Sequence, residues 1–442
     1  MITIVGAGPA GCLLALLLAR RGQRVTVYER RPDPGLLPSE AGRSINLALA
    51  ARGIRALRDA GVMEAVTPLL TPMRGRRLHD ISGTEQFLAY GQSHEMIYSV
   101  SRADLTRRLT EAARAQPGVA LHFNQQCLGY ADPGKLQLRD TASGSTYEVA
   151  AQRIVAADGA GSVLRQSLAQ RQGFIVEEDR LEHDYKELTL PVVNGHPPLA
   201  MDALHIWPRG GFMLIALPNA DGSFTATLFL PRSGPQSFEL LSSGAKVRDF
   251  FAREFPDALP LVPDLAAQFA AHPQGMLGTI HSPGWRDAER LLLIGDAAHA
   301  IVPFHGQGMN CAFEDCRILD GLLAHSPDDA FEHFEAQRRG DCEAIATMAL
   351  ENYAEMRDTV RDPGFQQQKD LAIALERSYP DRFIPRYSMV MFHDEIPYSL
   401  ALERGRVQQG ILNELASRPA ADPQVVANLI RERLPALSAA VQ

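Results

Sequence analysis

The N-terminal end of the chain holds the pattern that most restricts its fold. A short β-branched run, Ile2 to Val5, leads into the glycine-rich segment Gly6 to Gly11, and a helix-forming stretch follows from Leu13 to Arg20. A second strand-forming run, Val25 to Tyr28, ends at Glu29. This order predicts a βαβ unit, which is the first element of a Rossmann-like α/β domain.

The glycines of this unit and the acid at its end predict a nucleotide site. Gly6 permits a tight turn, Gly8 lets the backbone approach a pyrophosphate, and Gly11 allows the helix to pack closely on the strand. The helix N-terminus adds N–H groups and the positive end of its dipole. Glu29 can accept hydrogen bonds from the ribose hydroxyls of an adenosine and disfavours a 2′-phosphate, so FAD or NAD is expected here rather than NADP.

Two further apolar strands end in a Gly–Asp or Asp–Gly turn. Ile154 to Ala156 runs toward Asp158-Gly159, and Leu291 to Ile294 breaks at Gly295-Asp296. One nucleotide does not need three such turns, whereas an extended cofactor with a hydroxylated chain does. We therefore expect Asp296 to face the ribityl chain of a flavin, with the small residues after it lying against the isoalloxazine ring and a helix starting near Asn310.

The three turns, in this order and spacing, resemble the single-component flavin-dependent aromatic hydroxylases over most of the chain. The resemblance implies bound FAD, NADPH as electron donor, O₂ as co-substrate and oxygen transfer from a flavin C4a-hydroperoxide. No second GxGxxG is present, as expected for a family without a separate NADPH domain. The implied cofactor-binding residues are Gly6, Gly8, Pro9, Ala10, Gly11, Glu29, Arg30, Arg43, Arg102, Asp158, Gly159, Gly295, Asp296, Pro303, Gln307, Gly308, Met309 and Asn310.

Seven further runs, spread from end to end, resemble the kynurenine 3-monooxygenase branch of these hydroxylases. They are Gly42–Leu47, Met73–Arg76, Leu204–Pro208, Phe224–Leu230, Pro303–Asn310, Met348–Tyr353 and Phe383–Met389. The resemblance implies hydroxylation of L-kynurenine at carbon 3 to 3-hydroxy-L-kynurenine, a step of tryptophan catabolism. The alternatives are a related hydroxylase of another aromatic acid and a flavin-binding sensor without turnover.

The same resemblance assigns a substrate site by position. Arg76, Tyr90 and Asn352 match residues that hold the amino-acid carboxylate, and an arginine can pair a buried carboxylate through two parallel hydrogen bonds. The residues that match the lining around the aromatic ring are Phe229, Pro303, Phe304, His305, Met356 and Tyr387.

Three of these assignments have a plain alternative. Arg76 lies in an arginine-rich strand, where Arg74 or Arg77 could instead be the inward side chain. His305 is a candidate catalytic base, but a packed or solvent-facing imidazole is at least as common. Arg43 is either a solvated loop charge or a contact of the pyrophosphate or flavin.

Composition excludes several classes of protein. The formal net charge of −8 argues against a nucleic-acid partner. The five cysteines, Cys12, Cys127, Cys311, Cys316 and Cys342, show neither a CxxC pair nor metal-ligand spacing, so no metal and no disulfide framework are expected. No apolar leader opens the chain, and charges and Pro435 interrupt its last segment, so a cytoplasmic protein without a membrane partner is expected. A homodimer is one option for its oligomeric state.

A discontinuous arrangement of domains is expected, because the Gly295-Asp296 turn returns after a strand-rich stretch from about Leu188 to Leu230. That stretch alternates in hydrophobicity, as the strands of an antiparallel sheet do, and we expect it to cover the flavin. The expected divisions are an FAD-binding domain of 1–65, 99–180 and 276–336, a substrate domain of 66–98 and 181–275, and a C-terminal helical region of 337–442.

Overall fold

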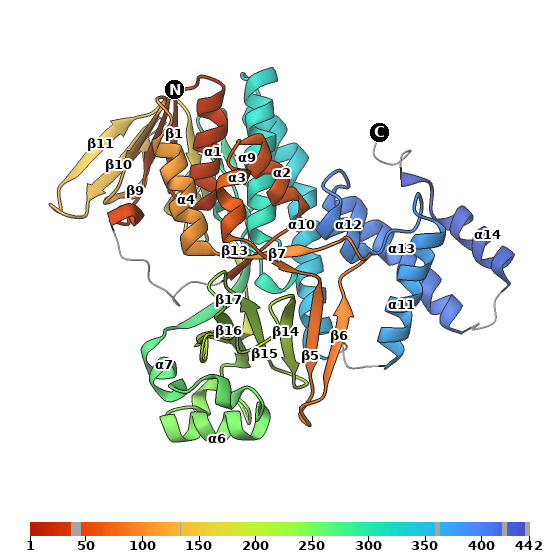
Figure 1. Ribbon diagram of the computed structural model, residues 1–442. Helices are drawn as coiled ribbons and strands as arrows, with labels where there is room; N and C mark the ends of the chain where they lie inside the picture. Colours follow the sequence, from red (N-terminus) through yellow and green to blue (C-terminus); the bar gives the residue numbers. More distant parts are fainter. Residues whose placement is uncertain (37–45, 133, 359–362, 418–421, 438–442) are drawn as a thin grey trace.

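A computed structural model of the chain describes residues 1–36, 46–132, 134–358, 363–417 and 422–437. Two large sheets lie at opposite ends of its main body, and a group of helices extends from one side (Figure 1). This agrees with the expected α/β class, with a second sheet and a C-terminal helical region. Arg43 lies outside the described residues.

The first sheet is the expected nucleotide-binding one. Its strand order is β18 (Arg286–Asp287), β19 (Leu291–Leu293), β12 (Ile154–Ala156), β1 (Ile2–Val5), β2 (Val25–Tyr28) and β8 (Val119–His122). All neighbouring strands are parallel except β18 and β19. Strand β1 is central and fully buried, which explains its uninterrupted apolar sequence.

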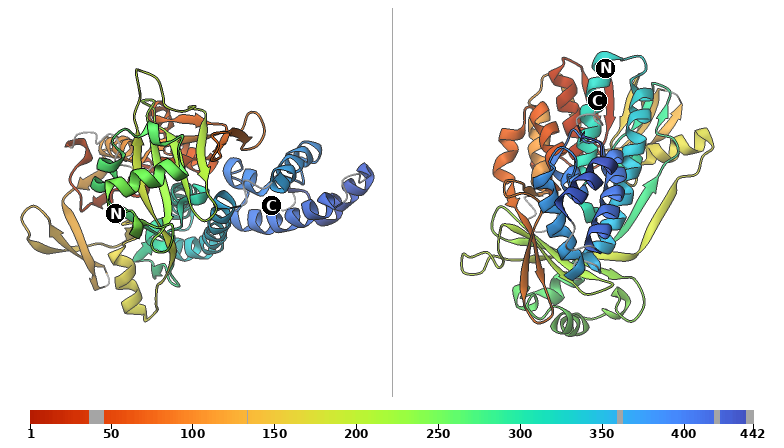
Figure 2. Two further views of the ribbon diagram at one scale, coloured as in Figure 1. Left: turned by 90° about the horizontal axis from the view of Figure 1, so that it is seen from below. Right: turned by 90° about the vertical axis from the view of Figure 1, so that its right-hand side faces the viewer.

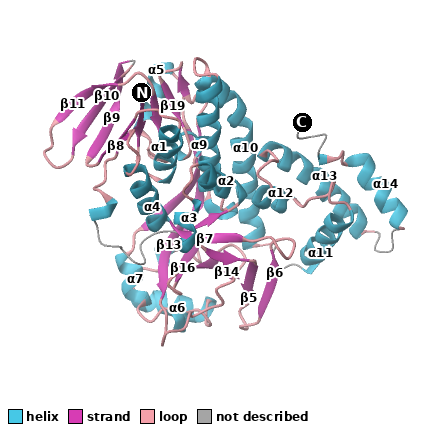
Figure 3. Ribbon diagram, turned by 45° about the horizontal axis from the view of Figure 1, so that its top comes forward, coloured by secondary structure: helices cyan, strands magenta, loops and turns pink. Residues whose placement is uncertain are grey.

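Helices cover this sheet (Figure 3). The glycine-rich turn leads into α1 (Pro9–Arg20), whose residues from Gly11 to Leu18 are all buried, because α1 packs between the sheet and two other helices. Those helices are α4 (Arg102–Arg114) and α9 (Gly308–His325). Helix α9 begins two residues before the expected position near Asn310. The other helices of this part are α2 (Ala51–Asp59), α3 (Met63–Val66), α5 (Val163–Gln172) and α8 (Asp296–His299).

The second sheet has seven strands in the order β17 (Gln274–His281), β13 (Glu177–Leu190), β16 (Phe224–Pro231), β15 (Met213–Pro218), β14 (Ala203–Pro208), β5 (Gly75–His79) and β6 (Glu85–Ala89). The strands between about Leu188 and Leu230 pair antiparallel, as expected, and β14 also pairs in parallel with β5, which lies outside that stretch. Strands β13 and β17 extend a few residues beyond the expected domain limits at 181 and 275. The domain limits themselves stay a prediction.

Side chains along β16 point alternately to the two faces of the sheet. Ala226, Leu228 and Leu230 join an aromatic-rich core beneath α6 (Gly244–Glu254) and α7 (Leu265–Ala271). Thr227 and Phe229 point to the opposite face, where they line a cavity. The sheet therefore serves as a wall between a structural core and a candidate site.

Two small sheets and the C-terminal helices complete the fold. The sheets are β3 (Asn46–Leu49), β7 (Ile97–Ser101) and β4 (Thr71–Met73), and β11 (Thr146–Ala150), β10 (Lys135–Asp140) and β9 (Gln125–Asp132). The helices are α10 (Ala330–Arg357), α11 (Pro363–Ser378), α12 (Arg386–Phe392), α13 (Tyr398–Ala416) and α14 (Pro423–Arg433). Helices α11, α13 and α14 extend away from the body (Figure 2). None of the helices in the described ranges combines the length and apolar character of a membrane crossing.

Candidate active site

The three glycine-bearing turns, two of which also carry an Asp, meet at one edge of the parallel sheet. Strands β19, β12 and β1 are consecutive neighbours, and carboxyl ends of parallel strands share an edge. The turns are connected by backbone hydrogen bonds, from the N–H of Ala157 to Val5 (2.8 Å) and from the N–H of Ile294 to Ala156 (3.0 Å). The structure thus brings together the segments that the sequence assigned to one cofactor.

The glycines of the first turn have different surroundings. Gly6 has a φ of +104°, and a Cβ there would overlap the carbonyl group of Ala157. A Cβ on Gly11 would overlap the carbonyl oxygen of Gly6, so these two glycines are required for packing of the strand and helix. A Cβ on Gly8 would meet nothing within 4 Å. The backbone at Gly8 faces open space of the kind that a pyrophosphate could fill.

Glu29 is fixed at the end of β2. Its carboxylate accepts hydrogen bonds from the N–H groups of Ala7 (2.7 Å) and Arg31 (2.9 Å) and from Nε of Arg31 (2.8 Å). Burial opposes ionisation, but the bonds from Arg31 outweigh it and lower the pKa of Glu29. An ionised acceptor is therefore held beside a cavity of about 1250 Å³, whose lining includes Gly6, Gly8, Glu29, Arg30, Arg102, Asp158, Gly159 and Asp296.

A second cavity, of about 1080 Å³, continues from the first, because Gly8, Arg102, Gly159 and Asp296 line both. Its remaining walls are mostly apolar or backbone, as a flat tricyclic ring requires. They include Pro9, Ala10, Pro303, Gly308 and Met309, all of which the sequence assigned to the cofactor. The two cavities together form the elongated site that FAD needs.

Asp158 carries an unpaired oxygen toward this site. One carboxylate oxygen accepts a hydrogen bond from the N–H of Val163 (3.1 Å), at the start of α5. The other, Oδ1, is buried without a hydrogen-bond partner among the described residues. Burial raises the pKa of Asp158 despite the hydrogen bond from the Val163 N–H. A hydroxyl donor from a ligand would satisfy this oxygen.

Arg165 connects two of the turns, a role that its sequence position did not reveal. Its guanidinium is buried, donates to the carbonyl oxygen of Ala297 at 2.9 Å and also bonds the carbonyl oxygen of Ala160. It therefore fixes the Asp158-Gly159 turn against the Gly295-Asp296 turn. Only the adjacency of β12 and β19 places these carbonyls within reach of one side chain.

Two residues assigned to the cofactor direct their side chains elsewhere. Gln307 is fully buried and accepts a hydrogen bond from the Tyr398 hydroxyl at 2.7 Å. Asn310 accepts from the N–H of Ala50 (2.9 Å) and donates to Ala48 (2.8 Å), so it ties α9 to the start of α2. Neither side chain lines the two cavities, and any contact with the cofactor would come from the backbone.

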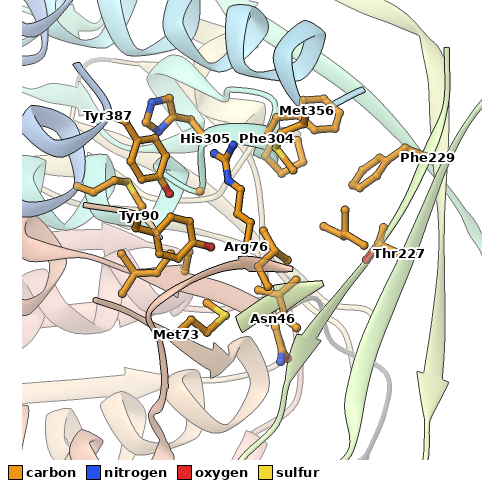
Figure 4. A pocket seen from close by; sticks show the side chains of 18 of the residues that line it. Asn46, Met73, Arg76, Tyr90, Thr227, Phe229, Phe304, His305, Met356 and Tyr387 are labelled. Carbon is orange, nitrogen blue, oxygen red and sulfur yellow. The ribbon is translucent and has the colours of Figure 1, made fainter. Parts of the chain in front are cut away.

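A third cavity, of about 810 Å³, adjoins the ring cavity. Figure 4 shows the side chains that line it. Asn46, Ala48, Pro303 and Gly306 line both cavities. Eight of the nine residues assigned to the substrate line it, namely Arg76, Tyr90, Phe229, Pro303, Phe304, His305, Met356 and Tyr387. A molecule in this third cavity would thus lie next to a ring held in the second.

Arg76 is the buried arginine of its strand, with 4% of its surface exposed, whereas Arg74 is exposed and Arg77 is partly exposed. Its Nη1 donates to Oε1 of Glu355 at 3.0 Å, and its Nη2 to Oδ1 of Asn352 at 3.4 Å. Its Nε is buried without a hydrogen-bond partner among the described residues. Burial opposes its charge, but Tyr387 and Glu355 raise the pKa of Arg76, so the guanidinium stays protonated.

Two tyrosines lie beside Arg76 (Figure 4). The rings of Tyr90 and Tyr387 are stacked with centroids 5.4 Å apart, and the Arg76 guanidinium carbon lies 5.0 Å from the Tyr387 centroid. Burial raises the pKa of both tyrosines, so both are neutral hydrogen-bond donors. The Tyr90 hydroxyl is buried without a partner within hydrogen-bond geometry, which leaves it available for an anion next to Arg76.

Aromatic side chains form the opposite wall. Phe229 packs on Phe304 with centroids 4.9 Å apart, and Phe304 stacks on Tyr353 at 4.0 Å. Met356, with 2% of its surface exposed, fills the space beside them. An apolar slot opposite a fixed guanidinium fits a molecule with an aromatic ring at one end and a carboxylate at the other.

His305 lies in the cavity as a neutral imidazole. It is buried, stacks on Tyr387 with centroids 5.4 Å apart, and its Nδ1 has no hydrogen-bond partner among the described residues. Burial, together with the positive charges of Arg386 and Arg76, lowers the pKa of His305 to about 3. Such a group is a weak base, so this environment favours orientation of a ligand over removal of a proton.

Asn352 is the one assigned substrate residue that does not line the cavity. Its Nδ2 donates to the carbonyl oxygen of Phe304 at 2.6 Å, and its Oδ1 accepts from Arg76. It therefore positions both of those residues from behind. Glu355, one turn further along α10, was not identified from the sequence, since a glutamate in a helix gives no sign of a buried partner on a distant strand.

Comparison with known proteins agrees with this arrangement. A family model described as "FAD binding domain" matches residues 1–236 and 279–348. Solved structures with the same fold include 2-methyl-3-hydroxypyridine-5-carboxylic acid oxygenase, with 22% identity, a TM-score of 0.67 and coverage of 80% of this chain and 92% of that one. Another is p-nitrophenol 4-monooxygenase from Pseudomonas putida DLL-E4, with 16% identity, a TM-score of 0.65 and coverage of 94% and 96%.

The curated relatives are much more similar. Kynurenine 3-monooxygenase of Stenotrophomonas maltophilia is 47% identical over 416 residues, covering 93% of this chain and 91% of that protein. Kynurenine 3-monooxygenase of Xanthomonas euvesicatoria is 49% identical over 421 residues, with the same two coverages.

Fold, cofactor site and family match together define an FAD-dependent flavoprotein hydroxylase. The fold and the three turns support the FAD site independently of sequence identity. Among such enzymes, the chain belongs to the kynurenine 3-monooxygenase family, since it is almost half identical to curated members over nearly its whole length.

Proposed function

We propose that this protein hydroxylates L-kynurenine at carbon 3, with NADPH as electron donor and O₂ as co-substrate. The observation that carries the proposal is the buried Arg76, which lies in an aromatic-walled cavity that adjoins the flavin-ring cavity. The relatives named kynurenine 3-monooxygenase support the same substrate. Tryptophan catabolism would be the corresponding metabolic context.

The carboxylate of kynurenine would pair with Arg76. An anion entering a dry cavity must be compensated, and a guanidinium does this with two charge-assisted hydrogen bonds. The unpaired Nε of Arg76 and hydroxyl of Tyr90 are donors in place for it. Lys369 adds positive charge nearby, although burial and the Arg76 charge lower its pKa to about 8.

The α-ammonium of kynurenine needs an acceptor, and Glu355 provides one. Its carboxylate lies 3.0 Å from Arg76 and its side chain is 27% exposed, so it can stay hydrated while it exchanges partners. An amino acid would therefore meet the Arg76 cation in the cavity, with the Glu355 anion next to that cation although Glu355 is not among the lining residues. If the ligand were an aromatic acid without an amino group, its carboxylate and that of Glu355 would compete for Arg76. This competition favours kynurenine over the phenolic acids.

FAD, when bound, would accept electrons from NADPH and activate O₂. This chain would contribute position and exclusion of water. Phe229 and Phe304 would hold the aromatic ring, and the shared residues Pro303 and Gly306 would set its distance from the flavin site. His305 would orient the ring's substituents as a neutral hydrogen-bonding group, since its low pKa makes it a poor base.

The direct test is NADPH oxidation by the purified holoenzyme with and without L-kynurenine, with the product identified by mass spectrometry. We expect oxidation that depends on kynurenine and yields 3-hydroxykynurenine. Anthranilate and a phenolic acid are the comparison substrates. Faster hydroxylation of either would assign a related activity, and bound FAD without turnover of any aromatic acid would indicate a sensor.

A further inference from the structure

A cluster of four chemically reactive side chains lies behind the flavin site. His299 on α8, Cys311 and Asp315 on α9, and Cys342 on α10 are all buried, and their ligating atoms lie within 4.8 Å of one another. The two sulfur atoms are 3.7 Å apart. The linear spacing of the cysteines gave no sign of this pair, because it forms only when α9 packs against α10 (Figure 1).

The cluster is built to hold negative charge on sulfur. Nη2 of Arg338 lies 3.3 Å from Sγ of Cys311, and His299 shares a 2.7 Å hydrogen bond with Asp315. The hydrogen bond from the Cys342 thiol and the charges of His299 and Arg338 lower the pKa of Cys311 despite burial. By contrast, burial raises the pKa of Cys127 to about 12. Thiolates, not thiols, are the reactive form.

A separate cavity gives small molecules access to the pair. It has a volume of about 650 Å³ and is lined by Cys342 and His299 together with polar side chains that include Arg339 and Glu343. It lies beside the ring cavity, since Ile301 lines both. A small uncharged oxidant in this cavity would meet Cys342, whose sulfur lies 3.7 Å from that of Cys311, without passing through the substrate site.

We propose that Cys311 and Cys342 form a reversible disulfide when hydrogen peroxide enters this cavity. The thiolate of the pair attacks one peroxide oxygen, the O–O bond breaks, and the released hydroxide takes the proton of the second thiol. That second sulfur then attacks the sulfenic acid, the S–O bond breaks, and the hydroxide takes a proton from His299. The sulfurs lose two electrons, peroxide gains two, and two waters form.

The same four groups could in principle bind a thiophilic metal ion, but their other contacts favour the redox role. Oδ2 of Asp315 already accepts from His299 and from the N–H of Gly295 (2.9 Å), and Oδ1 accepts from Nε of Arg338 (2.8 Å). The Arg338 guanidinium also places a positive charge beside Cys311, where a metal cation would be repelled. Zinc binding at these four groups would therefore contradict the proposal.

The disulfide would join the cofactor and substrate elements. Cys311 lies three residues after Gly308, which lines the ring cavity, and Cys342 lies on the helix that carries Asn352 and Met356. Formation of the bond requires the sulfurs to approach from 3.7 Å to about 2.05 Å. Since Asp315 holds the Gly295 turn, this movement should loosen the flavin site.

The test uses the holoenzyme, hydrogen peroxide and peptide mapping without reduction. We expect a Cys311–Cys342 crosslink that forms at least about tenfold faster than oxidation of Cys127 and is reversed by dithiothreitol. Cys127→Ser is the matched control and should form the same crosslink. In Cys342→Ser, dimedone should trap a sulfenic acid at Cys311.

Three results would overturn the proposal. The first is oxidation of Cys127 without the crosslink, and the second is one zinc ion per purified chain that protects both thiols. The third concerns the amount of bound FAD, measured by flavin fluorescence. We expect wild-type protein to lose FAD when it is oxidised and Cys342→Ser to keep it, so an unchanged amount in oxidised wild type would overturn the proposal. Kynurenine is absent from these assays, so their result is independent of the substrate assignment.

Discussion

The Arg76→Ala substitution tests the substrate site most directly. In the free enzyme it removes a guanidinium that is 4% exposed, but its partner Glu355 is 27% exposed and can be hydrated instead. The fold should therefore survive. When kynurenine binds, however, its carboxylate would enter the cavity without a cation, which for a buried pair costs on the order of 3–5 kcal/mol.

That cost corresponds to a roughly 100- to 5,000-fold increase in the dissociation constant for kynurenine. We expect a value near the lower limit, about 100-fold, because Lys369 and the Tyr90 hydroxyl remain and water can fill the space that Arg76 leaves. FAD should stay bound, since Arg76 does not line the two cofactor cavities. Perturbation of the flavin absorbance spectrum by kynurenine gives the dissociation constant.

Two controls separate the carboxylate contact from general damage. Arg77→Ala removes a partly exposed arginine of the same strand, paired with Glu85, and should change the affinity less than about twofold. The decarboxylated analogue of kynurenine should bind wild type and Arg76→Ala with similar affinity. If Arg76→Ala weakened both ligands equally, or left kynurenine binding unchanged, Arg76 would not hold the carboxylate.

Two further predictions concern the cofactor turn and the buried cluster. Gly8→Ala should fold with an unchanged melting temperature but bind FAD more weakly. Gly11→Ala should melt several degrees lower, because its Cβ overlaps Gly6. Equal melting temperatures of the two variants would contradict this prediction. The pKa of His299 is raised from 6.5 to about 9. The protonated imidazole therefore makes its full contribution to the free energy of unfolding below pH 6.5, and this contribution is lost as the pH rises through 9. Urea unfolding should show a loss of about 3 kcal/mol over that range, absent in His299→Gln, and a flat wild-type profile would refute it.

The sequence was sufficient to predict the cofactor strands, because their signals are local. Ile2–Val5 and Val25–Tyr28 were predicted with the bounds that the structure has, since continuous apolar runs next to glycine turns have few other solutions. Alternation could not choose between Arg74 and Arg76, and the structure shows why. Arg74 precedes β5 and is exposed, whereas Arg76 lies within the strand and is buried.

The residues that the sequence did not reveal depend on contacts between distant elements. Arg165, Glu355 and the Cys311–Cys342 pair acquire their roles from packing across 132, 279 and 31 positions respectively. No local pattern encodes such contacts. Resemblance to a family assigned Asn352 to the substrate carboxylate together with Arg76. The structure places Asn352 in contact with Arg76 and Phe304 and not in the lining of the cavity, and its role toward a carboxylate stays a prediction.

Asn352 also explains how the substrate and flavin sites are connected. Its side chain bonds Arg76 on one side and the backbone of Phe304 on the other, and Pro303 next to Phe304 lines both the substrate and the ring cavities. A carboxylate that draws Arg76 away from Asn352 would therefore release one side of the amide that bonds the loop beside the flavin site. If kynurenine binds as proposed, recognition of its amino-acid end and placement of its aromatic ring would belong to one network of contacts, in which Asn352 lines neither cavity.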